Sequence, residues 1–182
     1  MIRDDPQANL RIFYYDYLKL CFESENVNYN QYIGKVEEII NDENFRFMFY
    51  EEADPSFYDD LTFKQLIMEF FGVLGSGKYS VEEALMVYQV MDTVFIAFLR
   101  SIMILTGNCE ALEDYLPWRH TYDFLSKYFA VEVAFHDNCI KFVDTDIFVY
   151  QDSEQEVFMA YMDYDQADKQ EEVQEGEEQR DN

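Results

Sequence analysis

The spacing of apolar residues changes once along the chain, from a helical period to a strand period, and this change constrains the fold more than any other feature. Up to residue 129, apolar side chains recur at intervals of three and four residues, as on the faces of α-helices. From residue 131 they alternate with polar ones, as on half-buried strands. We therefore predict an α+β protein with a mainly helical bundle body, a small C-terminal antiparallel β-sheet and a disordered acidic tail.

The helical pattern is clearest after a predicted helix N-terminus at Ser80. Ser80 and Glu83 form a capping box, and the apolar stripe that follows predicts one helix over 81–105, about 37 Å long at 1.5 Å per residue. Its core-facing stripe includes Val87 and Leu105, and Gly107 is a typical C-terminal cap. Such a helix would be the spine of the bundle. The other predicted helices cover 5–22, 30–41, 45–53, 63–73, 110–115 and 118–129.

The alternating segment predicts a β-hairpin. A two-residue turn at Asp137 and Asn138 would set Phe135 opposite Ile140 and Val133 opposite Phe142, all on one face. Residues 146–150 and 157–161 are candidate third and fourth strands, although a helix is also possible for 157–161. The predicted organisation is a helical body over 1–108, a helix plus strands over 109–162, packed on the body or forming a small lobe, and a flexible tail over 163–182.

The charge balance is strongly acidic, with 38 Asp and Glu against 13 Lys and Arg, a net charge of -25. The last twenty residues carry 9 acidic and 2 basic side chains, or -7, which leaves -18 on residues 1–162. This excess argues against direct binding to nucleic-acid phosphates. Because 49% of the residues are hydrophobic, the chain is nevertheless expected to fold around a core.

A glycine-rich segment, Gly72–Lys78, resembles the phosphate-binding pattern GxxxxGK. Tyr79 stands where the magnesium-binding Ser or Thr belongs, and residues 63–71 before it have a helical pattern where the motif requires a strand. A nucleotide-binding enzyme using this loop is the third candidate function, and a turn between two helices is the favoured interpretation.

Other catalytic or metal-binding patterns are not evident in the sequence. The two histidines, His120 and His136, lie in no recognisable nucleophile or metal motif, so we predict neither enzymatic activity, nor a metal site, nor a cofactor. Cys21, Cys109 and Cys139 are too widely spaced for a disulfide or zinc framework, which favours reduced thiols in the host-cell cytosol. Charges within 84–105 favour a buried soluble helix over a membrane span.

The densest acidic stretch covers residues 37–60 and is also rich in aromatic residues. It contains one basic residue, Arg46, and we expect Phe45 and Phe47, among its aromatics, to supply contact area beside the carboxylates. Its acidic members are the predicted partner-binding residues: Glu37, Glu38, Asp42, Glu43, Glu51, Glu52, Asp54, Asp59 and Asp60.

In size, acidity, aromatic richness and lack of catalytic motifs, residues 1–162 resemble the DNA-mimicking inhibitors of phages and mobile elements, including anti-restriction and anti-CRISPR proteins. The resemblance is one of overall character and involves no shared motif. It implies an inhibitor that binds the basic nucleic-acid-binding surface of a nuclease, in particular a CRISPR effector, and blocks DNA binding or cleavage.

An immunity protein that neutralises a basic toxin is the alternative hypothesis, because it would present the same acidic surface to a basic active site. The apolar excess of the first helix suggests a homodimer, although enclosure of that helix within one chain explains the same pattern.

Overall fold

The structure is a computed structural model that describes residues 7–23, 29–48, 60–108, 117–136, 139–143, 147–151 and 157–161. The chain divides into two compact units, Met1–Glu132 and Val133–Asn182. The first contains the described helices and the second the described strands. The fold is mostly helical with a small antiparallel sheet, as the change of apolar period predicts.

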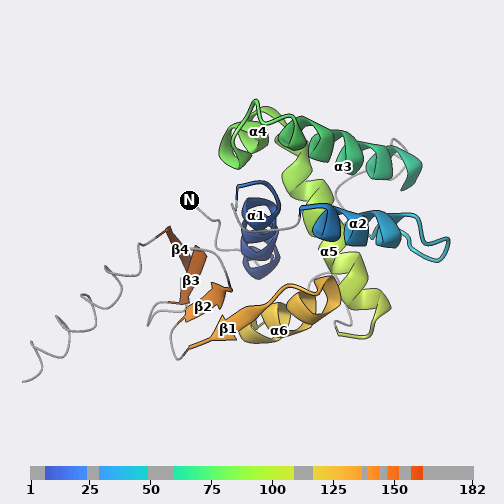
Figure 1. Cartoon of the computed structure of the whole chain (residues 1–182). Coiled ribbons are helices and arrows are strands. Elements are labelled where there is room, and N and C mark those ends of the chain that lie inside the picture. Colours follow the sequence, from blue (N-terminus) through green and yellow to red (C-terminus); the bar gives the residue numbers. More distant parts are fainter. Residues whose placement is uncertain are drawn as a thin grey trace, which may run out of the picture. The chain divides into compact units, whose positions relative to one another are not determined.

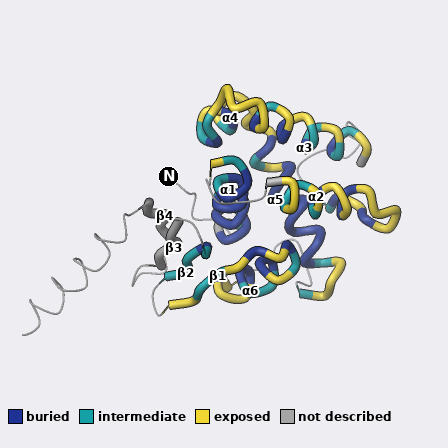
Figure 2. Tube along the Cα trace, in the orientation of Figure 1, coloured by how far each residue is buried: buried dark blue, intermediate teal, exposed yellow. Residues whose placement is uncertain are grey.

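The helical unit is arranged around two buried helices (Figure 1). Its elements are α1 (Ala8–Phe22), α2 (Tyr29–Ile40), α3 (Asp60–Gly75), α4 (Val81–Val87), α5 (Val90–Leu105) and α6 (Trp118–Phe129). Figure 2 shows that α1 and most of α5 are buried, whereas α2, α3 and α6 each expose an outer face. The predicted helices at 30–41 and 118–129 are confirmed to within one residue at each end.

Helix α1 is enclosed within the helical unit. It contacts α2, α4, α5 and α6, and buries apolar side chains on several faces, including Leu10, Ile12 and Phe13. Tyr14 of α1 stacks on Phe95 of α5 with ring centroids 4.4 Å apart. Enclosure therefore explains the apolar excess that suggested a homodimer.

The single helix predicted over 81–105 is wrong, because the chain bends by 105° between α4 and α5. The capping box of Ser80 and Glu83 is confirmed. However, α5 has only 16 residues, or about 24 Å. Val87 and Leu105, predicted to face the core, are exposed.

Polar contacts from α1 to both α4 and α5, described below, are the physical reason for this bend. Tyr88 at the break has a modest helix propensity but Gln89 has a high one, so local propensity does not explain the break and tertiary contacts decide it. No single described helix is long and apolar enough to cross a membrane. The bent pair of α4 and α5 meets the length and composition criteria only when both helices are taken together.

Residues 45–48 form neither helix nor strand, so the helix predicted over 45–53 is wrong at its beginning; residues 49–53 lie outside the described residues. The backbone N–H of Met48 donates to Oγ of Ser101 on α5, at 2.7 Å. Phe45 and Phe47 are buried and pack edge-on or tilted against Phe98 of α5. The hydrogen bond to Ser101 and the packing of both rings on Phe98 hold this segment against α5.

The second unit contains a four-stranded antiparallel sheet in the order β1-β2-β3-β4. Its strands are β1 (Val133–Phe135), β2 (Cys139–Phe142), β3 (Ile147–Gln151) and β4 (Val157–Tyr161). The predicted hairpin register is confirmed, since Phe135 pairs with Ile140 and Val133 with Phe142. The predicted helix at 110–115 and the acidic tail after residue 162 lie outside the described residues.

Candidate protein-binding surface

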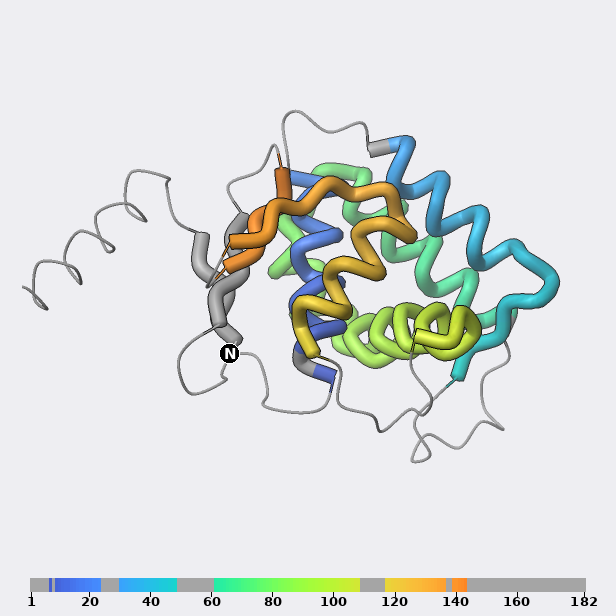
Figure 3. Tube along the Cα trace, turned by 90° about the horizontal axis from the view of Figure 1, so that it is seen from below, coloured from blue at the N-terminus to red at the C-terminus, as the bar shows by residue number. Residues whose placement is uncertain are grey.

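The predicted acidic surface begins at the C-terminal end of α2. Glu37 and Glu38 are exposed on the last turns of this helix, and Asp42 and Glu43 are exposed in the turn that follows. We call these four residues the α2 acidic end. Figure 3 shows that α2 ends in this turn at the outer edge of the helical unit.

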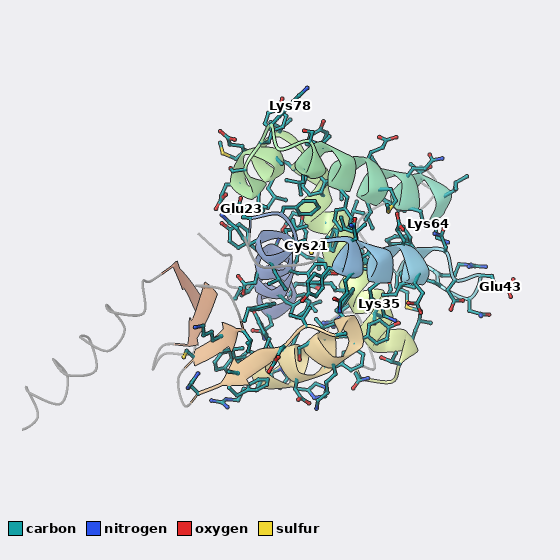
Figure 4. The ribbon with its side chains drawn as sticks, in the orientation of Figure 1. Cys21, Glu23, Lys35, Glu43, Lys64 and Lys78 are labelled. Atoms are coloured by element: carbon teal, nitrogen blue, oxygen red, sulfur yellow. The ribbon has the colours of Figure 1, made fainter. Side chains whose placement is uncertain are left out.

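The turn that follows α2 has a defined hydrogen-bond pattern. Oδ1 of Asp42 accepts from the backbone N–H of Asn44 at 2.8 Å, and the carbonyl of Asp42 accepts from the backbone N–H of Phe45 at 3.1 Å. The guanidinium of Arg46 donates to the carbonyl of Glu43 at 2.7 Å. Because the buried Phe45 anchors the turn from below, the acidic end is held outward, as the side chain of Glu43 shows in Figure 4.

Negative charge accumulates at the α2 acidic end in a way that costs stability. The C-terminus of a helix carries partial negative charge, and the last turn of α2 contains no basic residue to offset it. Asp42 and Glu43 follow in the turn, so four carboxylates lie within seven consecutive residues. One cation lies close by, because Nζ of Lys35 is 3.2 Å from Oε2 of Glu38.

Tyr128 of α6 adds an aromatic side chain beside these carboxylates. Nζ of Lys35 lies 5.5 Å from the centre of its ring. Partial burial raises the pKa of the Tyr128 hydroxyl, Lys35 lowers it, and Glu38 and Asp42 raise it, with a net increase. Tyr128 is distant in sequence from the 37–60 stretch, so inspection of that stretch did not identify it.

The side chains of the other five predicted partner-binding residues are not described by the structure. Asp60 is the first residue of α3, but its side chain is not described, and Glu51, Glu52, Asp54 and Asp59 lie outside the described residues. The prediction that Phe45 and Phe47 supply contact area is wrong. They are only 4% and 9% exposed, because they fill the core beside α5 and α3.

A second group of carboxylates connects α1 to α4 and α5. Along α1, Arg11, Tyr15, Lys19 and Glu23 recur at four-residue intervals and therefore lie along one side of the helix. All four contact α4 or α5. This spacing is a sequence signal that could have identified the polar stripe, although not its partners.

The contacts of this stripe explain how α4 and α5 are held. Lys19 Nζ is 2.5 Å from Oε1 of Glu82, and the hydroxyl of Tyr15 donates to the same carboxylate. Burial tends to raise the pKa of Glu82, but hydrogen bonds from Lys19 and Tyr15 outweigh it and lower the pKa from 4.5 to about 2.

The stripe also contacts α4 and α5 at their first turns. Oε1 of Glu23 accepts from the backbone N–H of Val81 at 2.8 Å. Arg11 forms an ion pair with Asp92 in the first turn of α5. Contacts to both helices thus fix the bend between them.

Asp16 is a further interior carboxyl, fully buried on α1. Its Oδ2 accepts a 2.9 Å hydrogen bond from the hydroxyl of Tyr122 on α6, which is also fully buried. Burial raises the pKa of Asp16 well above its usual value, and the hydrogen bond from Tyr122 opposes this shift only in part.

The Gly72–Lys78 segment has the geometry of a helix-to-helix turn. Gly72 and Gly75 belong to α3, and the backbone N–H groups of Ser76 and Gly77 donate to carbonyls of that helix. The first amide of α4 is already bound by Glu23, and Lys78 points away from the helices (Figure 4). A phosphate-binding loop requires a preceding strand, but helix α3 precedes this segment.

The described histidines are both exposed, and Nε2 of His120 lies 3.4 Å from the carbonyl of Asn108. Among the residues described, no group of three or more His, Cys, Asp or Glu side chains is arranged to hold a metal ion. Of the three cysteines, Cys21 is a buried free thiol whose pKa is raised by burial, Cys139 is a half-buried free thiol, and Cys109 lies outside the described residues.

Comparisons with known proteins identify no relative. No protein-family model, curated protein or solved structure matches this chain. Its arrangement is therefore interpreted from its own geometry and charge.

Proposed function

We propose that this protein is an acidic inhibitor that binds the basic nucleic-acid-binding surface of a nuclease and blocks DNA binding or cleavage. The target that we propose is a CRISPR effector in the cytosol of the host cell. The observation that carries the proposal is the α2 acidic end, four exposed carboxylates on the last turns of α2 and the anchored turn that follows it. In this proposal the protein has no catalytic activity and binds no nucleic acid directly.

The energetic cost of the acidic end supports a binding role. Carboxylates at a helix C-terminus are each unfavourable by about 0.3–1 kcal/mol. Solubility does not require charge at this position, because the rest of the chain is already strongly acidic. A basic partner would attract the same carboxylates, which favours binding and speeds association.

Spacing also fits a DNA-like surface. Duplex DNA presents one negative charge per about 1.7 Å of axis, and proteins that bind it carry Lys and Arg in matching grooves. The α2 acidic end places four carboxylates within seven consecutive residues, beside the aromatic ring of Tyr128. Carboxylates and a neighbouring aromatic can together occupy such a groove.

The test measures DNA binding by purified CRISPR effectors in the presence of the protein, using fluorescence anisotropy of a labelled target duplex. We expect the protein to displace the duplex, with an affinity that falls steeply as salt increases. The double variant Glu37→Gln with Glu43→Gln should weaken this inhibition. Glu69→Gln with Glu132→Gln is the matched control, because it removes the same charge from two other exposed positions.

Equal loss of inhibition in both double variants would assign the effect to net charge and overturn the role of the α2 acidic end. Absence of binding to every effector at low salt would overturn the nuclease target. Protection of cells from a co-encoded basic toxin, without inhibition of an effector, would instead identify an immunity protein.

A further inference from the structure

The bend between α4 and α5 exposes four large apolar side chains within five residues. Met86 is 75% exposed, Val87 65%, Tyr88 39% and Val90 51%. We call these residues the α4–α5 corner. Clustering of this kind marks interaction sites, whereas isolated exposed hydrophobic residues are ordinary.

Other exposed large hydrophobic side chains of the described residues are scattered along the chain. They are Leu61, Tyr79, Leu105 and Phe135. Leu61, at 61% exposure on α3, is comparable to Val87 in exposure but has no such exposed neighbour among the residues that the structure describes. It therefore provides a control for exposure without clustering.

The corner is held in shape by the helices behind it. Oε1 of Glu23 binds the first amide of α4, and Lys19 pairs with Glu82 of the same helix. The ring of Tyr88 packs edge-on against Phe70 of α3, with centroids 5.8 Å apart. A surface fixed before binding loses little conformational freedom when a partner is bound, which favours affinity.

Carboxylates flank the apolar side chains. Glu83 precedes Met86 by three residues and Val87 by four, so all three share one side of α4. Glu82 and Asp92, which pair with Lys19 and Arg11, still keep 45% and 41% of their side chains accessible. An apolar surface with this border favours a ligand whose apolar residues are accompanied by cations.

The charge also argues against a second copy of this chain as the occupant. Two chains of -25 repel each other, and an isologous contact would set the flanking carboxylates of one copy close to those of the other. A basic partner has the opposite electrostatics.

We propose that the α4–α5 corner binds an apolar, basic helical segment of a partner protein, with Lys or Arg beside Leu- or Phe-like anchors. Met86 and Val87 bind the apolar side of the segment, and Glu83 and Asp92 attract its cations. Only the identity of the partner rests on the proposed function. If that function holds, the segment belongs to the target nuclease, and the corner and the α2 acidic end are two separate contact surfaces.

The test uses a synthetic amphipathic helix of Leu and Lys as the probe, with a Leu and Glu helix of the same pattern for comparison. The full-length chain is labelled at its methionine methyl groups and titrated by NMR. We expect the Met86 methyl signal to shift with the Leu and Lys helix only, while the buried Met103 does not move.

The variant Met86→Ser with Val87→Ser should weaken binding of the Leu and Lys helix by about tenfold or more, as expected when two anchors are lost. Leu61→Ser is the matched control and should bind within about twofold of the wild type. Both changes are at exposed positions, and circular dichroism verifies that each variant folds.

Three results would overturn the proposal: no shift of Met86, equal shifts with both helices, or undiminished binding by the double serine variant. Sedimentation of the wild type as a dimer that the double serine variant dissociates would assign the corner to a second copy and overturn it as well. The proposed function is tested separately, by the effector assay with Glu37→Gln and Glu43→Gln. The synthetic helix requires no nuclease, so failure of one proposal can be distinguished from failure of the other.

Discussion

Carboxylates behave differently in two regions of the helical unit. At the contact of α1 with α4 and α5, Glu23 and Glu82 bind a backbone amide, a lysine and a tyrosine hydroxyl. At the α2 acidic end, Glu37 and Glu43 face solvent on a helix terminus that already carries partial negative charge. The first group connects helices, whereas the second raises the free energy of the folded state.

This difference shows that net charge alone does not describe an acidic protein. Residue type is the same in both regions, but Glu23 and Glu82 connect helices, whereas the contacts at the α2 acidic end, such as Lys35 with Glu38 and Asn44 with Asp42, stay within a few residues of one segment. An acid that costs stability without connecting anything is the stronger candidate for a binding role, because the folded chain itself gains nothing from it. The following predictions test the contrast, from the largest expected effect to the smallest.

Removing the Asp16 carboxyl should cause the largest loss. Asp16→Ala deletes the buried acceptor of the Tyr122 hydroxyl, which should lower the free energy of unfolding by about 1–3 kcal/mol. Urea denaturation at pH 5 measures the effect. Asp16→Asn is the control, since its amide oxygen can still accept that hydrogen bond, and a loss as large as that of Asp16→Ala would contradict the role of the hydrogen bond.

The pH dependence of the free energy of unfolding, compared between Asp16→Asn and the wild type, gives a second test. Because the pKa of Asp16 is raised in the folded state, the unfolded chain loses its proton first as pH rises above about 3.8, and the contribution of Asp16 to stability falls. Asp16→Asn cannot ionise, so its stability relative to the wild type should increase with pH. Parallel stability curves for the two chains would show that Asp16 does not titrate differently on folding.

Glu82→Gln should have an intermediate effect. It weakens the contacts with Lys19 and Tyr15, but 45% of the side chain is exposed, so solvent screening limits the loss to about 0.2–1 kcal/mol at pH 7. The sign of its pH dependence is opposite to that of Asp16. A lowered pKa gives stability that is present above pH 4.5 and lost as pH falls toward about 2.

Thermal unfolding of Glu82→Gln and the wild type at pH 7 and pH 2.5 measures this difference, with Glu69→Gln as an exposed control on α3. An effect of Glu82→Gln that does not shrink at the lower pH would argue against an ionic contribution.

Changes at the α2 acidic end should have the smallest effect and the opposite sign. Glu37→Gln with Glu43→Gln should leave the free energy of unfolding unchanged or raise it by a few tenths of a kcal/mol, because repulsion at the helix terminus is relieved. The gain should disappear in 1 M salt, where charges are screened within about 3 Å. A loss of stability, compared with Glu69→Gln and Glu132→Gln, would show that these carboxylates stabilise the fold, as Glu23 and Glu82 do.

Local signals in the sequence predicted local structure well. The capping box at Ser80 and the cap at Gly107, whose positive φ of 73° favours glycine, both involve residues a few positions apart. Pairing of Val133 with Phe142 follows from the length of one turn and a period of two. Such interactions need no information from the rest of the chain.

Prediction failed where distant contacts decided the outcome. A continuous apolar stripe predicted one helix over 81–105, but Glu23 binds Val81 across 58 residues and Arg11 binds Asp92 across 81, and these contacts hold a bend. Likewise, Phe45 and Phe47 alternate with polar residues and are compatible with either a surface or a core. Their packing against α5 placed them in the core.

For the candidate binding surface, the sequence by itself determined the acidic character of 37–43 and of the chain as a whole, because charge is a property of residue type. Only the tertiary structure distinguished exposed carboxylates from those that connect helices, brought Tyr128 beside Glu38, and exposed Met86 and Val87 at a bend. The physical reason is that helix propensity and charge act over a few residues, whereas burial and partner choice depend on side chains far apart in the sequence.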